Sequence, residues 1–326
     1  MTPVLKIVLR MMGKIWTNLL SGFISYTSLA NARTVDASPS GTSIYVSIST
    51  GVAMFIRAAD GTLSGRIDYA TNPEPYGIKV SPDGFHVYVA SWASPGSISR
   101  FIRASDGTLS GKIDFATGNY PREIVISADG TSVYVTCQSP AVITRFIRAS
   151  DGTLSGRIDY TANTGASGVA VSTDGTSVYN ANTTNISRFI RASDGTLSGK
   201  VDYTAGANPQ GIAISSDGNY VYVTNLNSAY LTKFNRASDG TLSGRIDYAT
   251  EGTGYRAIAI SPDGGGLYVK ASNYFGIFKR ASDGTLSGRI DYSITYSASD
   301  SIVITADGTS LYATNYNVAL SRFIRS

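Results

Sequence analysis

Very few side chains in this sequence could act as catalytic groups. Glu123 directly follows Arg122, and a second arginine in a comparable loop is Arg256. A carboxylate can act as a general acid or base, and a guanidinium group can stabilise an anion. The chemistry open to these residues is therefore acid–base catalysis by Glu123, with Arg122 or Arg256 stabilising negative charge on the substrate.

Catalysis by an activated serine or cysteine is not expected. Such a nucleophile needs a neighbouring base, and the only histidine is His86, two residues after the Asp83-Gly84 turn. This position predicts an exposed surface residue. No phosphate-binding glycine loop, zinc-binding His-Glu-x-x-His motif or Gly-x-Ser-x-Gly elbow occurs. We predict neither a cofactor nor a metal, and we expect the single cysteine, Cys137, to be a small residue at a strand end.

Asp-Gly pairs recur throughout the chain and could suggest calcium. A calcium site needs roughly six to eight oxygens that converge on one point, whereas these aspartates are spread along the chain. Glycine also supplies the positive φ that tight turns require. We therefore interpret the pairs as structural turns; their aspartates are Asp60, Asp83, Asp106, Asp129, Asp151, Asp174, Asp194, Asp217, Asp239, Asp263, Asp283 and Asp307.

These residues belong to an internal repeat of roughly 45 residues. One phrase, Phe-Ile-Arg-Ala-Ser-Asp-Gly-Thr-Leu-Ser-Gly, returns with small changes, and its opening returns at the C-terminus. A second phrase, Ser-x-Asp-Gly-x-x-Val-Tyr-Val, alternates with it. The phenylalanines are Phe55, Phe101, Phe146, Phe189, Phe234, Phe278 and Phe323, and the tyrosines are Tyr45, Tyr88, Tyr134, Tyr179, Tyr222, Tyr268 and Tyr312.

Each repeat divides into four short strands. In the second full repeat the alternation predicts strands over 77–81, 87–91, 98–104 and 108–116. Asp-Gly between two alternating runs is a strong hairpin signal. Four strands and about 45 residues per period are typical of a propeller blade. The sequence therefore predicts an all-β fold, a seven-bladed β-propeller with four-stranded antiparallel blades.

The last blade needs a strand from the other end of the chain. The final repeat stops at 323–326, before its fourth strand, while residues 18–27 align without gaps on the fourth strand at 61–70. We expect this N-terminal strand to close the last blade, which leaves the ring without an open edge. The predicted domains are an N-terminal extension over 1–11 and a single propeller over 12–326.

The first 32 residues superficially resemble a signal peptide. Cleavage after Ala32 would remove the closing strand, so we do not expect an ordinary signal peptide. The extension has apolar and basic residues at helical spacing and could dock on a partner, on a membrane surface or in an assembly; the alternative is a frayed or self-packed segment. No apolar stretch is long enough to span a membrane.

The composition fits an all-β protein without affinity for nucleic acid. Charged residues make up 15% of the chain, which contains 34 glycines and 21 tyrosines. The net charge of +4 is spread over single Lys and Arg residues at repeat positions, with Asp nearby. We therefore expect no nucleic-acid partner.

The two faces of the predicted ring differ. The face with the Asp-Gly turns is nearly uniform, whereas the opposite loop face varies from blade to blade. Aromatic, amide and guanidinium groups on loops held by a rigid ring suit recognition of a protein or glycan. The alternative is that the loops vary only because loop sequences are the first part of near-identical repeats to diverge. The candidate binding residues on this face are Tyr76, Trp92, Arg122, Glu123, Asn208, Gln210, Tyr255, Arg256, Asn273 and Tyr274.

The chain resembles the YVTN and lactonase-like seven-bladed propellers. The motifs that carry the resemblance are Ser215-Ser216-Asp217-Gly218 through Tyr222-Val223-Thr224-Asn225, and the stretch 234–242. The resemblance implies the fold over nearly the whole chain. Enzymes of that family, sugar-lactone hydrolases and muconate cyclases, use His, Glu and Arg in the central funnel; His86 does not match that pattern.

Two functions remain as hypotheses. The first is a non-catalytic structural, adhesion or binding module, at a cell surface or in a virion, that recognises a protein or glycan through the variable loop face. The alternative is a lactonase-like enzyme, a sugar-lactone hydrolase or muconate cyclase, that uses carboxylate and arginine residues in the central funnel. The first hypothesis favours an extracellular, cell-surface or virion location over a cytoplasmic one.

Overall fold

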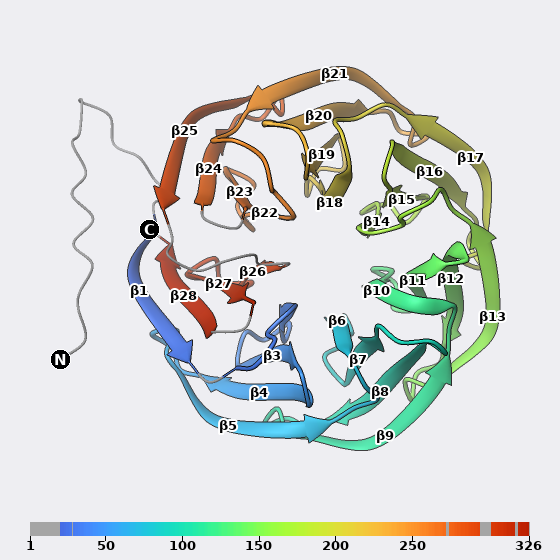
Figure 1. Cartoon of the computed structure of the whole chain (residues 1–326), viewed down its shortest axis with the longest axis vertical. Helices are drawn as coiled ribbons and strands as arrows, with labels where there is room; N and C mark the ends of the chain where they lie inside the picture. Colours follow the sequence, from blue (N-terminus) through green and yellow to red (C-terminus); the bar gives the residue numbers. More distant parts are fainter. Residues whose placement is uncertain (1–19, 28, 272–273, 294–300, 317–318, 326) are drawn as a thin grey trace.

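Seven four-stranded antiparallel sheets surround a central axis (Figure 1). The computed structural model describes residues 20–27, 29–271, 274–293, 301–316 and 319–325. The predicted seven-bladed propeller is confirmed. The N-terminal extension over 1–11 lies outside the described residues. No helix in the described ranges is long and apolar enough to cross a membrane.

Each blade is a meander whose first strand lies nearest the axis and whose fourth lies outermost (Figure 1). Blades 1 to 4 comprise β2 Val35–Ala37, β3 Ser43–Ile48, β4 Gly51–Arg57, β5 Leu63–Ala70; β6 Pro75–Val80, β7 His86–Ser91, β8 Ser97–Arg103, β9 Leu109–Ala116; β10 Asn119–Ile126, β11 Ser132–Ser139, β12 Ala141–Arg148, β13 Leu154–Thr161; β14 Val169–Val171, β15 Ser177–Ala181, β16 Ile186–Arg191 and β17 Leu197–Tyr203. Blades 5 to 7 comprise β18 Pro209–Ile214, β19 Tyr220–Asn225, β20 Tyr230–Arg236, β21 Leu242–Ala249; β22 Ala257–Ile260, β23 Gly266–Lys270, β24 Tyr274–Arg280, β25 Leu286–Ser293; β26 Ile302–Ile304, β27 Ser310–Asn315, β28 Ala319–Arg325 and β1 Leu20–Thr27.

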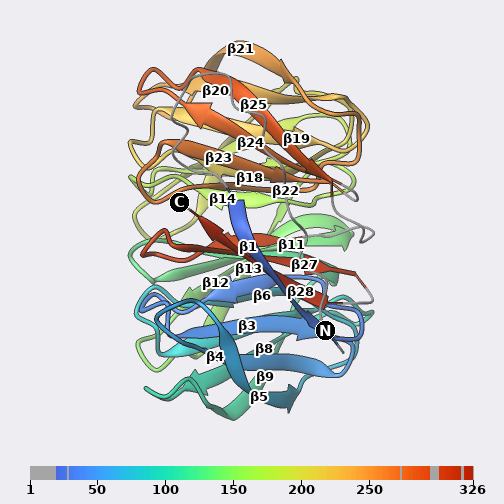
Figure 2. The ribbon, with the colours of Figure 1, turned by 90° about the vertical axis from the view of Figure 1, so that its left-hand side faces the viewer.

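The N-terminal strand closes the ring as predicted. In the last blade, β1 pairs antiparallel with β28 from Leu20 opposite Arg325 to Thr27 opposite Ala319. The two strands run side by side (Figure 2), and β1 is the outermost strand of the blade (Figure 1). The ring of Phe23 lies 5.3 Å from that of Phe323 between their centroids. The two ends of the chain therefore share one sheet.

The hydrophobic core lies between neighbouring blades. One cluster joins Tyr45 and Met54 of blade 1 to Ile78, Val87 and Val89 of blade 2, and all five are at most 3% exposed. The second strand of each blade is buried on both faces, which explains why Val-Tyr-Val recurs there instead of an apolar–polar alternation. Burial of these seams makes each blade depend on its neighbours.

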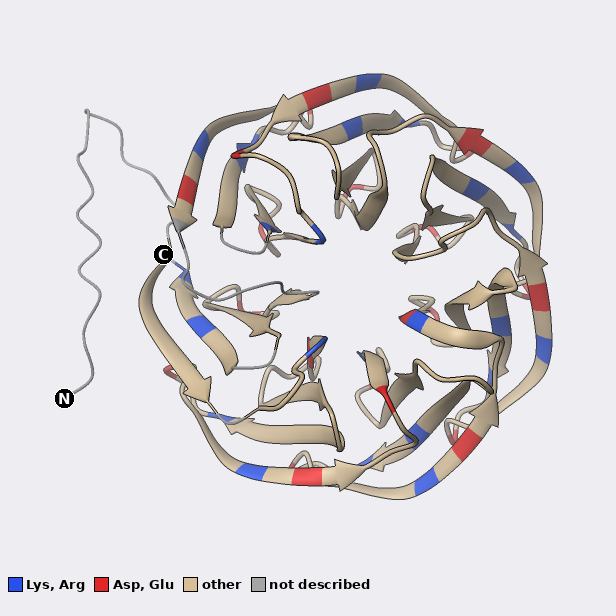
Figure 3. Cartoon of the chain, in the orientation of Figure 1, with Lys and Arg blue, Asp and Glu red and all other residues tan. Residues whose placement is uncertain are grey.

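The outermost strands of blades 1 to 6 carry charge of both signs. Arg66 pairs with Asp68 at 2.7 Å, and Arg157 with Asp159 at 2.6 Å. Figure 3 shows basic and acidic segments side by side along these strands. Charge on an exposed sheet edge opposes pairing with another sheet.

An arginine at the end of each third strand binds the preceding blade on the turn face. Arg148 donates from Nε to the Tyr88 hydroxyl at 2.9 Å and from Nη2 to Asp83 Oδ2 at 2.6 Å. Its Nη1 donates to the carbonyl of Gly130 in its own blade at 3.1 Å. We call this arrangement the interblade latch. The Arg–Asp pairs are Arg57–Asp307, Arg148–Asp83, Arg191–Asp129, Arg236–Asp174, Arg280–Asp217 and Arg325–Asp263.

The same aspartates shape their turns. Asp129 Oδ1 accepts from the backbone N–H of Thr131 at 2.9 Å and from its hydroxyl at 2.8 Å. One carboxylate oxygen therefore organises the turn, and the other binds the arginine of the next blade. This double role agrees with the interpretation of the Asp-Gly pairs as structural turns.

The expectation that His86 is exposed is wrong. His86 lies on the turn face, as its position predicts, but it is only 4% exposed. Its Nδ1 lies 2.9 Å from Nη2 of Arg148, the latch arginine of blade 3. The physical reason is that the second strand begins at this residue, and second strands are buried between blades.

One junction lacks the acidic member of the latch. Blade 1 has Ser40 where the other blades have aspartate, and its hydroxyl reproduces only the local turn contacts, to Ser38 at 3.1 Å and Thr42 at 2.8 Å. The arginine of blade 2, Arg103, bonds instead to Tyr45 and Ser43. The seam between blades 1 and 2 therefore has no latch carboxylate.

Ser40→Asp should stabilise the protein. The new carboxylate can accept from Arg103, and an ion pair at this half-exposed position contributes about 0.5–1 kcal/mol to the free energy of unfolding. Urea unfolding measures the change, and Ser40→Asn is the uncharged control of equal size. Equal stability of the two variants would contradict the role assigned to the latch carboxylate.

Stability should fall in acid because the latch carboxylates must stay ionised. Partial burial alone would raise the pKa of Asp307, but hydrogen bonds from Thr305 and Thr309 and the charge of Arg57 lower it to about 2. A lowered pKa contributes stability above the ordinary value near 3.8 that is lost as the pH falls through the folded value. Urea unfolding between pH 6 and 2 should show a decline below about pH 4, with a shallower slope in Asp307→Asn.

Candidate functional site

The seven innermost strands line an axial cavity of about 350 Å³. They are β2, β6, β10, β14, β18, β22 and β26 (Figure 1). Most of the wall is small or apolar, with Val169, Ala170, Ile212, Ile258 and Val303 among the lining residues. A volume of this size lies within the range of small-molecule sites.

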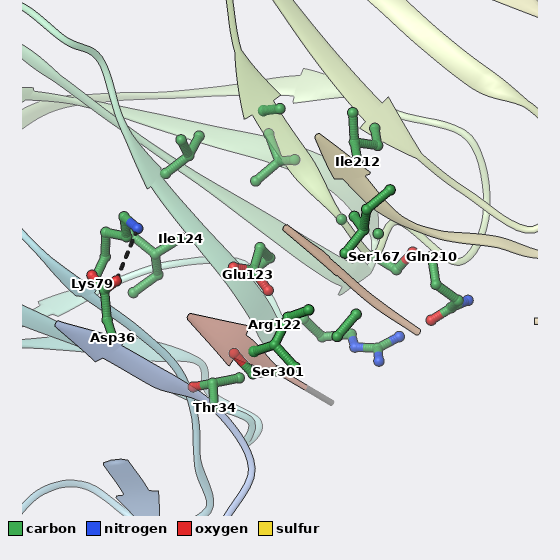
Figure 4. A pocket seen from close by; sticks show the side chains of 18 of the residues that line it. Thr34, Asp36, Lys79, Arg122, Glu123, Ile124, Ser167, Gln210, Ile212 and Ser301 are labelled. Carbon is green, nitrogen blue, oxygen red and sulfur yellow. Dashed lines mark hydrogen bonds and ion pairs between the residues drawn. The ribbon is translucent and has the colours of Figure 1, made fainter. Parts of the chain in front are cut away.

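Ionisable side chains reach the cavity wall from three consecutive inner strands. They are Asp36 on β2, Lys79 on β6 and Glu123 on β10 (Figure 4). Counted back from the turn, Asp36 and Lys79 occupy the same place in their repeats. The corresponding residues of the other blades are Val125, Ala170, Ala213, Ala259 and Val303. Asp36, Lys79 and Glu123 thus form a charged sector of the wall over blades 1 to 3, whereas blades 3 to 7 place valine or alanine at the position of Asp36 and Lys79.

Asp36 and Lys79 form an ion pair across the seam between blades 1 and 2. Lys79 Nζ donates to Asp36 Oδ1 at 3.2 Å, and the backbone N–H of Val80 donates to Oδ2 at 2.8 Å. The side chain of Asp36 is 9% exposed and that of Lys79 is 39% exposed. The two oxygens of Asp36 are thus both engaged, and this carboxylate is a fixed part of the wall.

The surroundings keep Lys79 charged. The charge of Asp36 raises the pKa of Lys79 against the opposing effect of burial, and the charge of Glu123 raises it further. Because its ordinary pKa is already near 10.5, Lys79 is a cation at neutral pH. Its chemical role is that of a fixed positive charge; it is not an amine nucleophile.

β-Bulges bring two consecutive residues of a strand to the cavity. The register of β10 against β11 shifts between Pro121 and Ile124, and Arg122 and Glu123 both line the cavity. Regular alternation would point these side chains to opposite faces. Matching shifts begin at Pro75 in β6 and at Pro209 in β18. Proline cannot donate to the ladder, which favours a bulge at each position.

Arg122 is held at the mouth of the cavity by a tyrosine. Its Nη2 donates to the Tyr76 hydroxyl at 2.8 Å, and its guanidinium carbon lies 5.1 Å from the centroid of that ring. The guanidinium of Arg33 lies 5.0 Å from the same ring and pairs with Glu74 at 3.0 Å. The mouth of the cavity over blades 1 to 3 is therefore rich in guanidinium groups.

Left-handed backbone conformations support the mouth. Among the described residues, four other than glycine have positive φ near 55°: Asn31, Glu74, Tyr120 and Asn208. Each precedes by two positions a residue of the mouth, namely Arg33, Tyr76, Arg122 and Gln210. Blades 4 and 6 use Gly165 and Gly254 at the same position. For a residue such as Glu74 or Tyr120 this conformation costs about 1–2 kcal/mol.

Of the ten predicted binding residues, five line one cavity, four do not, and one lies outside the described residues. The five that meet there are Tyr76, Arg122, Glu123, Gln210 and Arg256. Trp92, Asn208 and Tyr274 are absent from the cavity wall. Tyr255 is only 1% exposed and belongs to the apolar core of blades 5 and 6, so its assignment to an accessible binding face is wrong. Asn273 lies outside the described residues.

Sequence reasoning missed Asp36 and Lys79. Both lie in short apolar strands, where a lone charged residue is typical of the exposed face of an amphipathic strand. Both residues can be recognised when the repeats are aligned with one another, because Asp36 and Lys79 then stand where the other blades carry valine or alanine. Inner strands face the axis of the ring, so a charge at that position enters the channel.

A family model described as a seven-bladed β-propeller lactonase matches residues 52–157, 152–246 and 196–294. The overlap of the three matches reflects the repeat. Together they cover most of the chain. A search of curated protein sequences finds no match.

Solved structures share the fold at low identity. The periplasmic gluconolactonase of Pseudomonas aeruginosa is 18% identical with a TM-score of 0.74, covering 92% of each chain. Hydrazine synthase of Kuenenia stuttgartiensis is 20% identical with a TM-score of 0.70, covering 92% of this chain and 97% of that one. A Bacteroides uniformis protein, whose name carries a provisional 6-phosphogluconolactonase assignment, is 24% identical with a TM-score of 0.70, covering 81% and 84%. At these identities the likeness establishes the fold alone.

The leading hypothesis from the sequence is contradicted. A non-catalytic structural or adhesion module does not agree with a lactonase family match over most of the chain. This match favours the enzymatic alternative. The sequence favours a non-catalytic function because its only histidine does not match the funnel pattern of the family. The charged residues on the inner strands are not evident from local sequence patterns.

Asp36→Asn should lower the pKa of Lys79. The variant removes the largest contribution that raises this pKa and leaves the opposing effect of burial. NMR titration of ¹³C-labelled lysine side chains measures the change. An unchanged titration of Lys79 would contradict the ion pair as the cause.

Proposed function

This chain belongs to the lactonase family of seven-bladed β-propellers, and from that premise we propose that it hydrolyses a sugar lactone in the axial cavity. The observation that carries the proposal is the charged sector formed by Asp36, Lys79 and Glu123, with Arg122 and Arg256 on the same cavity wall. The cavity of about 350 Å³ suits a single sugar ring.

Glu123 is the proposed general base. Asp36 is a poor candidate because both of its oxygens already accept hydrogen bonds, from Lys79 and Val80. His86 lies on the turn face beside Arg148, outside the cavity wall. Glu123 is the remaining carboxylate among the residues that line the cavity.

The reaction requires one water molecule and no further reactant. Glu123 takes a proton from water as the water oxygen attacks the lactone carbonyl carbon, and the carbonyl oxygen becomes an oxyanion. The cations Lys79, Arg122 and Arg256 supply positive charge for this oxyanion. Collapse of the intermediate breaks the bond between the carbonyl carbon and the ring oxygen, and protonated Glu123 returns the proton to the departing oxygen.

The fixed network around the site keeps these charges in place. Tyr76 holds Arg122, and Asp36 holds Lys79, so neither cation must be ordered when the substrate binds. Charges that are already oriented stabilise an oxyanion better than mobile ones. The seam between blades 1 and 2 therefore contributes directly to the proposed chemistry.

Glu123→Gln should abolish most lactone hydrolysis. Loss of a general base lowers kcat by about 10²- to 10⁴-fold, whereas the similar size of glutamine should preserve the fold. A pH-stat assay with glucono-1,5-lactone and 6-phosphoglucono-1,5-lactone, corrected for spontaneous hydrolysis, measures the effect. The matched control is Glu251→Gln, which alters an exposed glutamate paired with Arg289 on the outside of the ring. Equal activity of Glu123→Gln and the wild type would refute the assignment.

A further inference from the structure

An aromatic surface adjoins the mouth of the cavity over blades 1 to 3. The rings of Trp92 and Tyr120 lie 5.3 Å apart between their centroids, and both side chains are partly exposed. Arg33 links this pair to the cavity, because its guanidinium lies 6.0 Å from the Trp92 ring and 5.0 Å from that of Tyr76, which lines the wall. Arg33 therefore lies between the aromatic pair and the tyrosine that lines the cavity.

Backbone hydrogen bonds fix the loops that carry this surface. The N–H of Trp92 donates to the carbonyl of Glu74 at 2.7 Å, and that of Tyr120 donates to the carbonyl of Ala93 at 2.9 Å. Glu74 and Tyr120 hold the left-handed conformation for which blades 4 and 6 use glycine. The strained backbone places Tyr120 against Trp92, and Glu74 beside Arg33.

The mouth over blades 4 and 5 is different. Blade 4 contributes Gly165 and Ser167, and blade 5 contributes Asn208 and Gln210. The aromatic pair thus lies on the same side of the ring as Asp36, Lys79 and Glu123.

We propose that Trp92 and Tyr120 form a subsite for a second sugar ring, so that the preferred substrate is the lactone of a disaccharide aldonic acid. This inference rests on the proposed function, since it assigns the substrate class of the same cavity. The lactone ring occupies the cavity, and the attached sugar packs its C–H face on the aromatic pair. Arg33 and Glu74 at the edge of the pair can bond to its hydroxyl groups.

The test compares two substrates that differ only in the second ring. Initial rates with glucono-1,5-lactone and cellobiono-1,5-lactone give kcat/KM for the wild type, Tyr120→Gly and Tyr120→Phe. Glycine adopts the left-handed conformation without strain, so Tyr120→Gly should fold with a melting temperature close to that of the wild type. Tyr120→Phe keeps the ring and is the matched control.

We expect the wild type to prefer the disaccharide lactone, and we expect Tyr120→Gly to lower its kcat/KM by about five- to tenfold, the order of one aromatic contact. The rate with glucono-1,5-lactone should be unchanged, and Tyr120→Phe should behave as the wild type. Trp92→Ala is a second variant and should show the same loss of selectivity. If the role of Tyr120 were merely structural, Tyr120→Gly would lower kcat/KM equally for both substrates.

Two results would overturn the inference, and they are distinguishable. The first result is hydrolysis of glucono-1,5-lactone without preference for the larger substrate, or with a preference that persists in Tyr120→Gly and Trp92→Ala. This result would refute the subsite and leave the proposed function intact. Absence of hydrolysis of both lactones removes the proposed function and the subsite with it.

Discussion

The structure depends on the seams between blades. A four-stranded blade cannot bury both faces alone, and each second strand is covered only when two neighbours pack against it. Apolar clusters fill each seam, and on the turn face the interblade latch adds an arginine, a tyrosine and in six seams an aspartate. Because every seam needs a partner, the ring must close. The pairing of β1 with β28 is therefore a requirement of the whole fold.

The seam between blades 1 and 2 is arranged differently from the others. It lacks the latch carboxylate on the turn face, where Ser40 replaces aspartate. It instead carries the Asp36–Lys79 pair in the channel and the Arg33–Glu74 pair at the loop face. At this seam the ion pairs therefore lie in the channel and at the loop face, whereas at the other six seams an ion pair lies on the turn face. The charged sector of the proposed site begins at the same seam.

The fold could be predicted from the sequence because its signals repeat. Seven phenylalanines and seven tyrosines gave the number of blades, and the decayed repeat before Thr27 gave the closure. The site was harder to predict because it depends on exceptions to the repeat. Asp36 and Lys79 are each a single exception at a repeat position where the other blades carry valine or alanine. The bulge that places Arg122 and Glu123 on the cavity wall is indicated in the sequence only by Pro121.

Burial also follows from packing between blades, which local patterns do not reveal. His86 looked exposed beside a turn and is buried by the neighbouring blade. Tyr255 was assigned to a loop and is buried in the core of blades 5 and 6. The turn aspartates were predicted correctly because their partners lie within the same short segment.

The most direct measurement of the central claim is a crystal structure of the protein with gluconolactam, a non-hydrolysable analogue of the lactone. We expect the lactam carbonyl in the axial cavity, with its oxygen toward the cations Lys79, Arg122 or Arg256 and its carbon beside Glu123. A lactam bound on the outer strands or on the turn face, with the axial cavity empty, would contradict it.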